Sequence, residues 1–252
     1  MLHRRFQQIC LGLASLCVAS GALTLAEDAS VAPPTEITTP AGKLQVRKVL
    51  FLGNSITLHG PAPQIGWTGN WGMAASTLEK DYVHLLMEQI SQSTESKPES
   101  MVRNIADFER QHGGYNIQEG LKAELAFEAD LVVVAIGENV PALETEDAKA
   151  KYRAAFSALL AELKQHGHPT ILVRSCFWAN PAKDEIMRPA CTEVGGVYID
   201  VGALGQVEAN FARSERKFEH AGVAGHPGDR GMQAISDELW KAITKQSTLW
   251  KE

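Results

Sequence analysis

The residue best placed to do chemistry is Ser55, which follows the apolar run 49–52 and the pair Gly53-Asn54. A short apolar run that stops at a glycine is typical of a buried parallel strand ending in a turn. A hydroxyl at that position could attack a carbonyl group if a base and oxyanion donors lie nearby. On its own, Ser55 could equally cap the next helix, as serine often does.

Three other polar signals lie far from Ser55 in the chain. The region of Asn104 belongs to the end of a second expected strand, Gly137-Glu138-Asn139 ends an apolar run, and Gly225-His226-Pro227 comes just before the last expected helix. The carboxyl ends of parallel strands meet at one edge of a sheet, and ligands bind there in open α/β proteins. We therefore expect these residues to share one cleft.

Strands and helices alternate along the chain. The run 131–136 is apolar throughout, which predicts a central strand covered on both faces. Strands are expected at 49–53, 101–106, 131–136, 170–173 and 197–200, and helices at 81–92, 117–127, 146–166, 183–193 and from 229 onward. The alternation predicts a single-domain, three-layer α/β/α fold with a five-stranded parallel sheet.

The ordered motifs resemble those of the SGNH (GDSL-like) hydrolases over about residues 46–243. Gly53-Asn54-Ser55-Ile56-Thr57 is similar to the first block of that family, Gly137-Glu138-Asn139 to the third, and His226-Pro227 to the end of the last. Each motif alone is weak, but the ordered set is specific. The resemblance implies a flavodoxin-like sheet and an esterase that needs no metal or organic cofactor.

The resemblance also implies a role for each matched residue. Ser55 would be the nucleophile and His226 the general base. The Ser55 backbone N–H, the Asn139 side chain and one further donor from the region of Asn104 would form the oxyanion hole.

Two positions depart from the family pattern. Val223 stands where an aspartate three residues before the histidine is usual, so no triad acid is visible. A backbone carbonyl could orient the imidazole in a Ser-His dyad, or Asp200 or Glu219 could approach from elsewhere; we favour the dyad. In addition, Ile105 follows Asn104 without the usual glycine.

Substrate contacts are expected from four further residues. The long segment 58–78 carries Trp67 and Trp71, which could form a stacking platform for a sugar ring or simply anchor the loop to the core. Asn54 and Glu138 lie within the first and third motifs and could also touch substrate. A surface salt bridge is the simpler interpretation of Glu138 and Arg174.

The amino terminus has the layout of an export signal. Basic residues precede an apolar segment rich in Leu, Ala, Ser and Gly, which predicts a signal peptide at 1–26, a linker at 27–43 and a hydrolase domain at 44–252. The competing interpretation is an uncleaved membrane anchor. With a cleaved signal, the protein would be periplasmic or extracellular and would contact the membrane only through that signal.

Composition limits the partners. The formal net charge is -6 over 252 residues and no basic stripe is present, which argues against nucleic acid as a partner.

Cys176 and Cys191 remain after signal cleavage and could form a disulfide or stay as buried free thiols. Neither cysteine has metal-ligand spacing, and oligomeric state is left open.

These observations favour an exported serine esterase that removes O-acetyl or similar small acyl groups, with a small-molecule or glycan ester as substrate. The carbohydrate part depends on the resemblance, the export signal and the tryptophan-bearing loop. Two alternatives stay open: a lipase-like or thioesterase-like acyl hydrolase, and a glycan-binding module that kept the fold without catalysis.

Overall fold

The computed structural model describes residues 39–251. The predicted signal peptide at 1–26 and most of the predicted linker lie outside the described residues. The strands of the main sheet are β2 (Lys48–Gly53), β3 (Glu99–Asn104), β4 (Leu131–Ala135), β5 (Thr170–Arg174) and β6 (Val197–Ile199). Their order is β3-β2-β4-β5-β6, and every neighbouring pair is parallel. This confirms the predicted five-stranded, flavodoxin-like sheet.

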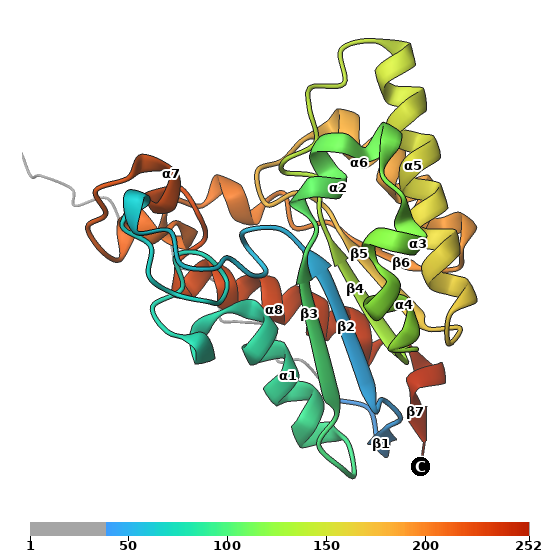
Figure 1. The fold of residues 1–252 in the computed structure, drawn as a ribbon. Helices are drawn as coiled ribbons and strands as arrows, with labels where there is room; N and C mark the ends of the chain where they lie inside the picture. The colour runs from blue at the N-terminus through green and yellow to red at the C-terminus, as the bar shows by residue number, and fades with distance from the viewer. Residues whose placement is uncertain (1–38, 252) are drawn as a thin grey trace, which may run out of the picture. The chain divides into compact units, whose positions relative to one another are not determined.

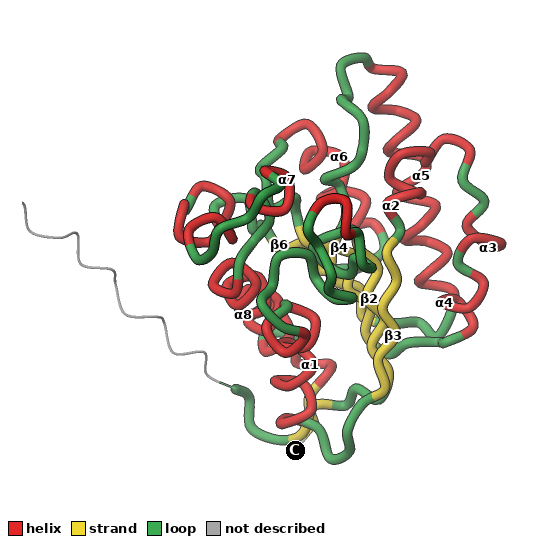
Figure 2. The backbone as a smooth tube through the Cα atoms, turned by 60° about the vertical axis from the view of Figure 1, so that its left-hand side comes forward, coloured by secondary structure: helices red, strands yellow, loops and turns green. Residues whose placement is uncertain are grey.

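Helices cover both faces of the sheet (Figure 1). One face carries α1 (Tyr82–Ser93) and α8 (Asp229–Thr244). The other face carries α2 (Ala106–Gln111), α3 (Ile117–Gly120), α4 (Lys122–Ala126), α5 (Glu146–Gln165) and α6 (Pro181–Glu193). The tube view in Figure 2 shows the same three layers from the side.

The alternation of side chains along β2 explains the two cores. Val49 and Phe51 pack into the cluster formed with α1 and α8, whereas Leu50 and Leu52 pack into the cluster on the α5 side. Successive side chains of a strand point to opposite faces, so a strand covered on both faces must be apolar at every position. β4 lies in the centre of the sheet and is buried along its whole length, as its sequence predicts.

Two helical regions differ from the expectation. The helix expected at 117–127 is divided at Leu121, next to Gly120, where a β-carbon would lie 2.4 Å from the Tyr115 hydroxyl. The helix α2 was not predicted; it begins where Asn104 Oδ1 accepts the Ala106 N–H at 2.9 Å. Short 3₁₀ turns occur at Pro63–Ile65, Leu78–Lys80, His112–Gly114, Leu204–Gln206, Glu208–Asn210, Ala212–Ser214 and Ser247–Leu249.

The ends of the described chain pair with each other. β1 (Lys43–Leu44) and β7 (Trp250–Lys251) form a two-stranded antiparallel sheet, and the Trp250 ring lies against Trp240 of α8. Within residues 39–251, none of the helices combines the length and apolar character that a membrane crossing needs.

Candidate active site

Ser55 lies in a tight turn directly after β2. The Asn54 carbonyl oxygen accepts the N–H groups of Thr57 and Leu58, both at 2.9 Å. Asn54 Oδ1 also accepts the Ile56 N–H at 3.2 Å. Within residues 39–251, the Ser55 N–H donates to no acceptor, which leaves it free for a ligand.

Gly53 makes this turn possible. A β-carbon at this position would lie 1.8 Å from Thr57 Oγ1, so only glycine lets the chain fold back this closely. Thr57 is itself fixed, because its hydroxyl lies 2.7 Å from the Tyr82 hydroxyl at the start of α1. The first sequence motif is therefore a structural unit that presents Ser55 at the carboxyl edge of the sheet.

His226 is held in the segment between α7 (Ala221–Ala224) and α8. Its carbonyl accepts the Ala212 N–H at 2.9 Å, and its N–H donates to the Val223 carbonyl at 3.0 Å. Two backbone N–H groups at the start of α8 donate to the Glu215 carboxylate. These bonds fix the backbone on both sides of the imidazole.

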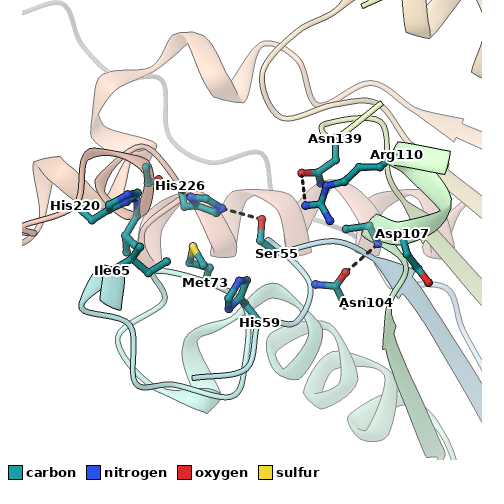
Figure 3. Close-up of a pocket in the computed structure, with 13 residues that line it drawn as sticks. Ser55, His59, Ile65, Met73, Asn104, Asp107, Arg110, Asn139, His220 and His226 are labelled. Atoms are coloured by element: carbon teal, nitrogen blue, oxygen red, sulfur yellow. Dashed lines mark hydrogen bonds between the residues drawn. The ribbon is translucent and has the colours of Figure 1, made fainter. Parts of the chain in front are cut away.

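The two side chains meet in the structure. Ser55 Oγ lies 2.8 Å from His226 Nε2, although 171 residues separate them (Figure 3). On the other side of the ring, Nδ1 lies 2.7 Å from the Gly222 carbonyl oxygen. A carbonyl oxygen only accepts hydrogen bonds, so Nδ1 carries the hydrogen. Nε2 then has its lone pair facing the Ser55 hydroxyl, which is the tautomer that a general base needs.

Within residues 39–251, no carboxylate forms a hydrogen bond with the imidazole of His226. Val223 is 1% exposed and packs in an apolar cluster. Among residues 39–251, no carboxylate forms an ion pair with His226. Asp200 instead contacts Ser175 and Arg188. The group that orients the imidazole in this structure is therefore the Gly222 carbonyl.

Burial lowers the pKa of His226, and the Gly222 carbonyl opposes this by accepting the Nδ1 hydrogen. The imidazole is therefore neutral, and able to accept a proton, over a wider range of pH than an exposed histidine. The Trp178 indole also packs against the imidazole edge to face, with the ring centroids 5.4 Å apart. Trp178 is partly exposed and was not singled out from the sequence.

Ser55 and His226 open into a cavity of about 460 Å³ (Figure 3). One wall comes from the segment 58–78 and from α7; the other comes from the end of β3, α2 and the loop after β4. The lining residues are Ser55, His59, Ile65, Met73, Asn104, Ala106, Asp107, Arg110, Asn139, His220, Gly222, Val223 and His226. The cavity thus brings together the matched residues of all three sequence motifs.

Glu109 of α2 is a residue that the sequence analysis missed. It is fully buried, and its carboxylate accepts four hydrogen bonds. Oε1 accepts from Asn54 Nδ2, Gly137 N and Asn139 N, while Oε2 accepts from Asn139 Nδ2 at 2.7 Å. Burial and the nearby Glu138 carboxylate raise the pKa of Glu109, and the donated N–H groups oppose that rise. Glu109 is the fourth residue of a short helix, and a glutamate at such a position gives no distinctive signal in the sequence.

Asn139 is therefore oriented from two sides. Its Nδ2 donates to Glu109, and its Oδ1 accepts from Arg110 Nη2 at 3.2 Å. An amide nitrogen carries two hydrogens, so one N–H of Asn139 stays available at the cavity. The preceding Gly137 has a φ of 127°, and a β-carbon there would lie 2.5 Å from Cys176 Sγ, so glycine is required in this loop.

Glu138 and Asn54 lie beneath the cavity and do not line it. Glu138 and Arg174 form a buried ion pair at 2.7 Å, with side chains 4% and 0% exposed. Asn54 is also fully buried and donates to Glu138 at 2.7 Å. Burial opposes ionisation of Glu138, yet Arg174 and the Phe177 N–H bring its pKa below the usual range. The expected substrate contacts of Asn54 and Glu138, and the surface salt bridge, are thus corrected to a buried network.

Asn104 lines the cavity but serves mainly to connect two loops. Its Nδ2 donates to the Leu58 carbonyl at 2.7 Å, which ties the end of β3 to the segment after Ser55. The N–H groups of Ile105 and Ala106 donate to the Gly53 carbonyl and to Asn104 Oδ1. The oxyanion donor expected near Asn104 is therefore not available at residues 105 and 106.

Trp67 and Trp71 anchor the segment 58–78 and do not line the cavity. Their rings pack edge to face with centroids 5.5 Å apart. The Trp67 indole donates to the His59 carbonyl, and the Trp71 indole donates to the Ala75 carbonyl. Of the two interpretations, the anchor fits the structure and the sugar platform at this cavity does not, because Trp67 is 6% exposed and neither ring lines the cavity.

The two cysteines are buried free thiols. Burial raises the pKa of Cys191 to about 11, so its thiol stays protonated at neutral pH. Within the described part of the chain, no cluster of three histidine, cysteine or acidic side chains could hold a metal ion.

Solved structures share the fold of this chain. A scan against protein-family models and a search of curated protein sequences found no match. A Bacteroides ovatus protein described as a candidate GDSL-like lipase matches with a TM-score of 0.51 and 12% identity, over 80% of this chain and 99% of its own. The chain has the SGNH (GDSL-like) hydrolase fold.

Two further structures share this SGNH fold over a part of their length. A Bacillus subtilis protein matches with a TM-score of 0.54 and 12% identity, over 82% of this chain and 59% of its own. An acetyl xylan esterase from the rumen bacterium Butyrivibrio proteoclasticus matches with a TM-score of 0.50 and 11% identity, over 81% of this chain and 65% of its own. The chain therefore spans less than two thirds of these two proteins.

Proposed function

We propose that the chain is an exported serine esterase that hydrolyses small acyl esters, such as O-acetyl groups, on carbohydrate. The observation that carries the proposal is the contact between Ser55 and His226, in which Nε2 is held as an acceptor by the Gly222 carbonyl. The descriptions of two proteins with the same fold, a candidate GDSL-like lipase and an acetyl xylan esterase, support the ester and the carbohydrate parts. The layout of residues 1–26 supports export.

In this mechanism, Ser55 Oγ attacks the ester carbonyl while His226 Nε2 takes its proton. The imidazolium is then stabilised by the Gly222 carbonyl through Nδ1–H, without a carboxylate. His226 returns the proton to the departing alcohol, and an acyl-Ser55 ester remains. A water molecule, deprotonated by His226, releases the acid and restores the hydroxyl.

The oxyanion would form between the two walls of the cavity. The free Ser55 N–H and the second N–H of Asn139 Nδ2 are the donors available there. In this scheme Glu109 and Arg110 act on the oxyanion through Asn139: they hold the amide plane with its remaining N–H toward the cavity. Donors fixed in advance stabilise developing charge more than mobile ones, because no reorganisation is needed during the reaction.

The size and lining of the cavity favour a small acyl group. Its volume is about 460 Å³, and Ile65, Met73, Ala106 and Val223 supply apolar surface beside the serine. A long lipid chain would extend out of this space, so we place the lipase-like activity second. Hydrolysis of 4-nitrophenyl acetate faster than of the octanoate ester is expected.

The test is hydrolysis of 4-nitrophenyl acetate and of acetylated xylan by the wild-type protein and by Ser55→Ala. Activity that disappears in the variant supports the esterase. Wild-type inactivity on both esters, together with retained binding of the deacetylated polysaccharide, would instead support a glycan-binding module.

A further inference from the structure

Arg110 is a cation at the wall of the cavity, and the proposed mechanism uses only its hydrogen bond to Asn139. It lies at the end of α2, its side chain is exposed, and it is the one lysine or arginine among the described residues that line the cavity. Its Nη2 donates to Asn139 Oδ1 at 3.2 Å. In Figure 3 the guanidinium reaches toward Asn139, on the side of the cavity where Ser55 lies.

Most of the N–H groups of this guanidinium make no hydrogen bond to residues 39–251. Arginine has five N–H groups, and the bond to Asn139 uses one of them. Within residues 39–251, Arg110 forms no ion pair with a carboxylate. The two carboxylates next to it in α2 are directed elsewhere: Glu109 is turned into the protein, and Asp107 accepts the Phe108 N–H. Figure 3 shows the Asp107 carboxylate pointing away from Ser55.

We propose that Arg110 determines substrate specificity by binding an anionic group, a carboxylate of an acidic sugar, on the ester substrate. The planar fork of a guanidinium matches the two oxygens of a carboxylate and can bind them in a bidentate manner. Because one N–H is already fixed on Asn139, the fork is oriented before the substrate arrives. The inference depends on the proposed esterase function and names the substrate class for the same cavity.

The position of Arg110 links substrate binding to the oxyanion hole. A substrate carboxylate bound to the free N–H groups of Arg110 would hold the sugar at the wall that carries Asn139. The acyl group would then lie toward Ser55 and the apolar surface beside it. The binding energy would be used to place the ester carbonyl beside the two expected oxyanion donors. A hydrogen bond to a charged group is typically strong enough to change kcat/KM by about ten- to a hundredfold.

The experiment uses two substrates that differ only in charge: an O-acetylated methyl uronoside with a free carboxylate, and the same compound with that carboxyl group methyl-esterified. Release of acetate gives kcat/KM for each. The wild-type protein is expected to prefer the acid by about ten- to a hundredfold, and the preference should fall as salt is added. In Arg110→Gln, the ratio should approach one.

Arg103→Gln is the matched control. Arg103 lies seven residues earlier, on β3, pairs with Glu124 at 3.7 Å and does not line the cavity. It should keep the wild-type ratio. The ratio compares two substrates on one enzyme, so a general loss of activity in Arg110→Gln does not affect the result.

A binding measurement covers the case in which Arg110→Gln is too slow to assay. Calorimetry with Ser55→Ala should show tighter binding of the non-acetylated methyl uronoside than of the neutral methyl glycoside, and Ser55→Ala/Arg110→Gln should lose this difference. A wild-type ratio near one, or a ratio or binding difference that survives Arg110→Gln, would overturn the inference. Failure of the esterase proposal looks different: neither acetylated compound is cleaved, or cleavage persists in Ser55→Ala.

Discussion

The Nδ1 atom of His226 lies 2.7 Å from the carbonyl oxygen of Gly222, four residues earlier in the chain. A main-chain carbonyl fixes the tautomer and orientation of the imidazole, as the acid of a triad does, but it brings no full negative charge. The histidine is therefore correctly placed yet receives less help in becoming a cation.

The pH dependence of activity follows from this environment. Burial lowers the pKa of His226, and the neutral form is the one that accepts the serine proton. Activity should therefore be fully present above that pKa and fall as the pH drops through it, with the midpoint of the acidic limb below the usual histidine value of about 6.5. The measurement is kcat/KM for 4-nitrophenyl acetate from pH 4 to 9. A midpoint above 7 would mean that a carboxylate, or another raising influence, acts on the ring.

Restoring the usual acid should not help. Val223 is 1% exposed inside an apolar cluster, so an aspartate there would be desolvated, and Nδ1 already has a partner. We expect Val223→Asp to lower the free energy of unfolding by about 1–3 kcal/mol and to give no gain in kcat/KM. Val223→Ala controls for the lost apolar contact. A rise in kcat/KM for Val223→Asp alone would show that the dyad is limited by the missing charge.

Asp200 gives a companion test. Its carboxylate contacts Ser175 and Arg188, so Asp200→Asn should change kcat far less than His226→Ala does. Equal losses in the two variants would place Asp200 behind the imidazole during turnover.

The role of Glu109 is best measured through Asn139. Asn139→Ala should lower kcat by about 10²–10³-fold, the usual cost of losing an oxyanion donor. Both Glu109 oxygens accept from N–H groups, so Glu109→Gln must turn an amide nitrogen toward a donor and should disturb Asn139. We expect kcat to fall with KM little changed. Because Glu109 acts through Asn139, the double variant should lose no more than Asn139→Ala does.

Glu124→Gln is the control for this cycle, since Glu124 is also a buried carboxylate of the helical layer but pairs with Arg103 outside the cavity. Glu124→Gln should leave kcat within about twofold of wild type, because Glu124 lies away from the reacting atoms. Losses that add in Glu109→Gln/Asn139→Ala would contradict this role, because they would show that Glu109 affects turnover independently of Asn139.

The buried ion pair beneath the site should matter for stability. Arg174→Met leaves the Glu138 carboxylate buried without its cation, which typically costs about 3–5 kcal/mol. Glu138→Gln/Arg174→Met removes both charges and should recover part of that loss. Denaturant unfolding of the three proteins measures the effect, and a single variant within about 1 kcal/mol of wild type would contradict it.

The sequence predicted the sheet because its strands are buried on both faces. Continuous apolar runs such as 131–136 have few alternative structures. The order of the strands was implied by the family resemblance and not by the runs themselves. The sequence also placed Ser55, Asn139 and His226 at one edge of the sheet, since each follows or borders an element that ends there.

What the sequence did not predict are contacts that depend on side-chain direction. Glu138 and Asn54 belong to the motifs, but their side chains point into the protein, whereas Arg110 and Asn139 point into the cavity. Glu109 was missed because one carboxylate in a short helix looks like a solvated charge until its four donors are placed around it. Neighbouring positions can thus have opposite roles, and only the fold separates them.

The most direct test of the Ser55–His226 dyad is covalent labelling with a fluorophosphonate, followed by intact-mass and peptide mass spectrometry. The dyad predicts one phosphonyl group per chain, on the peptide that contains Ser55, with labelling lost in Ser55→Ala and slowed by orders of magnitude in His226→Ala. An active protein whose Ser55 peptide stays unlabelled, or one that is labelled at the same rate without His226, would contradict it.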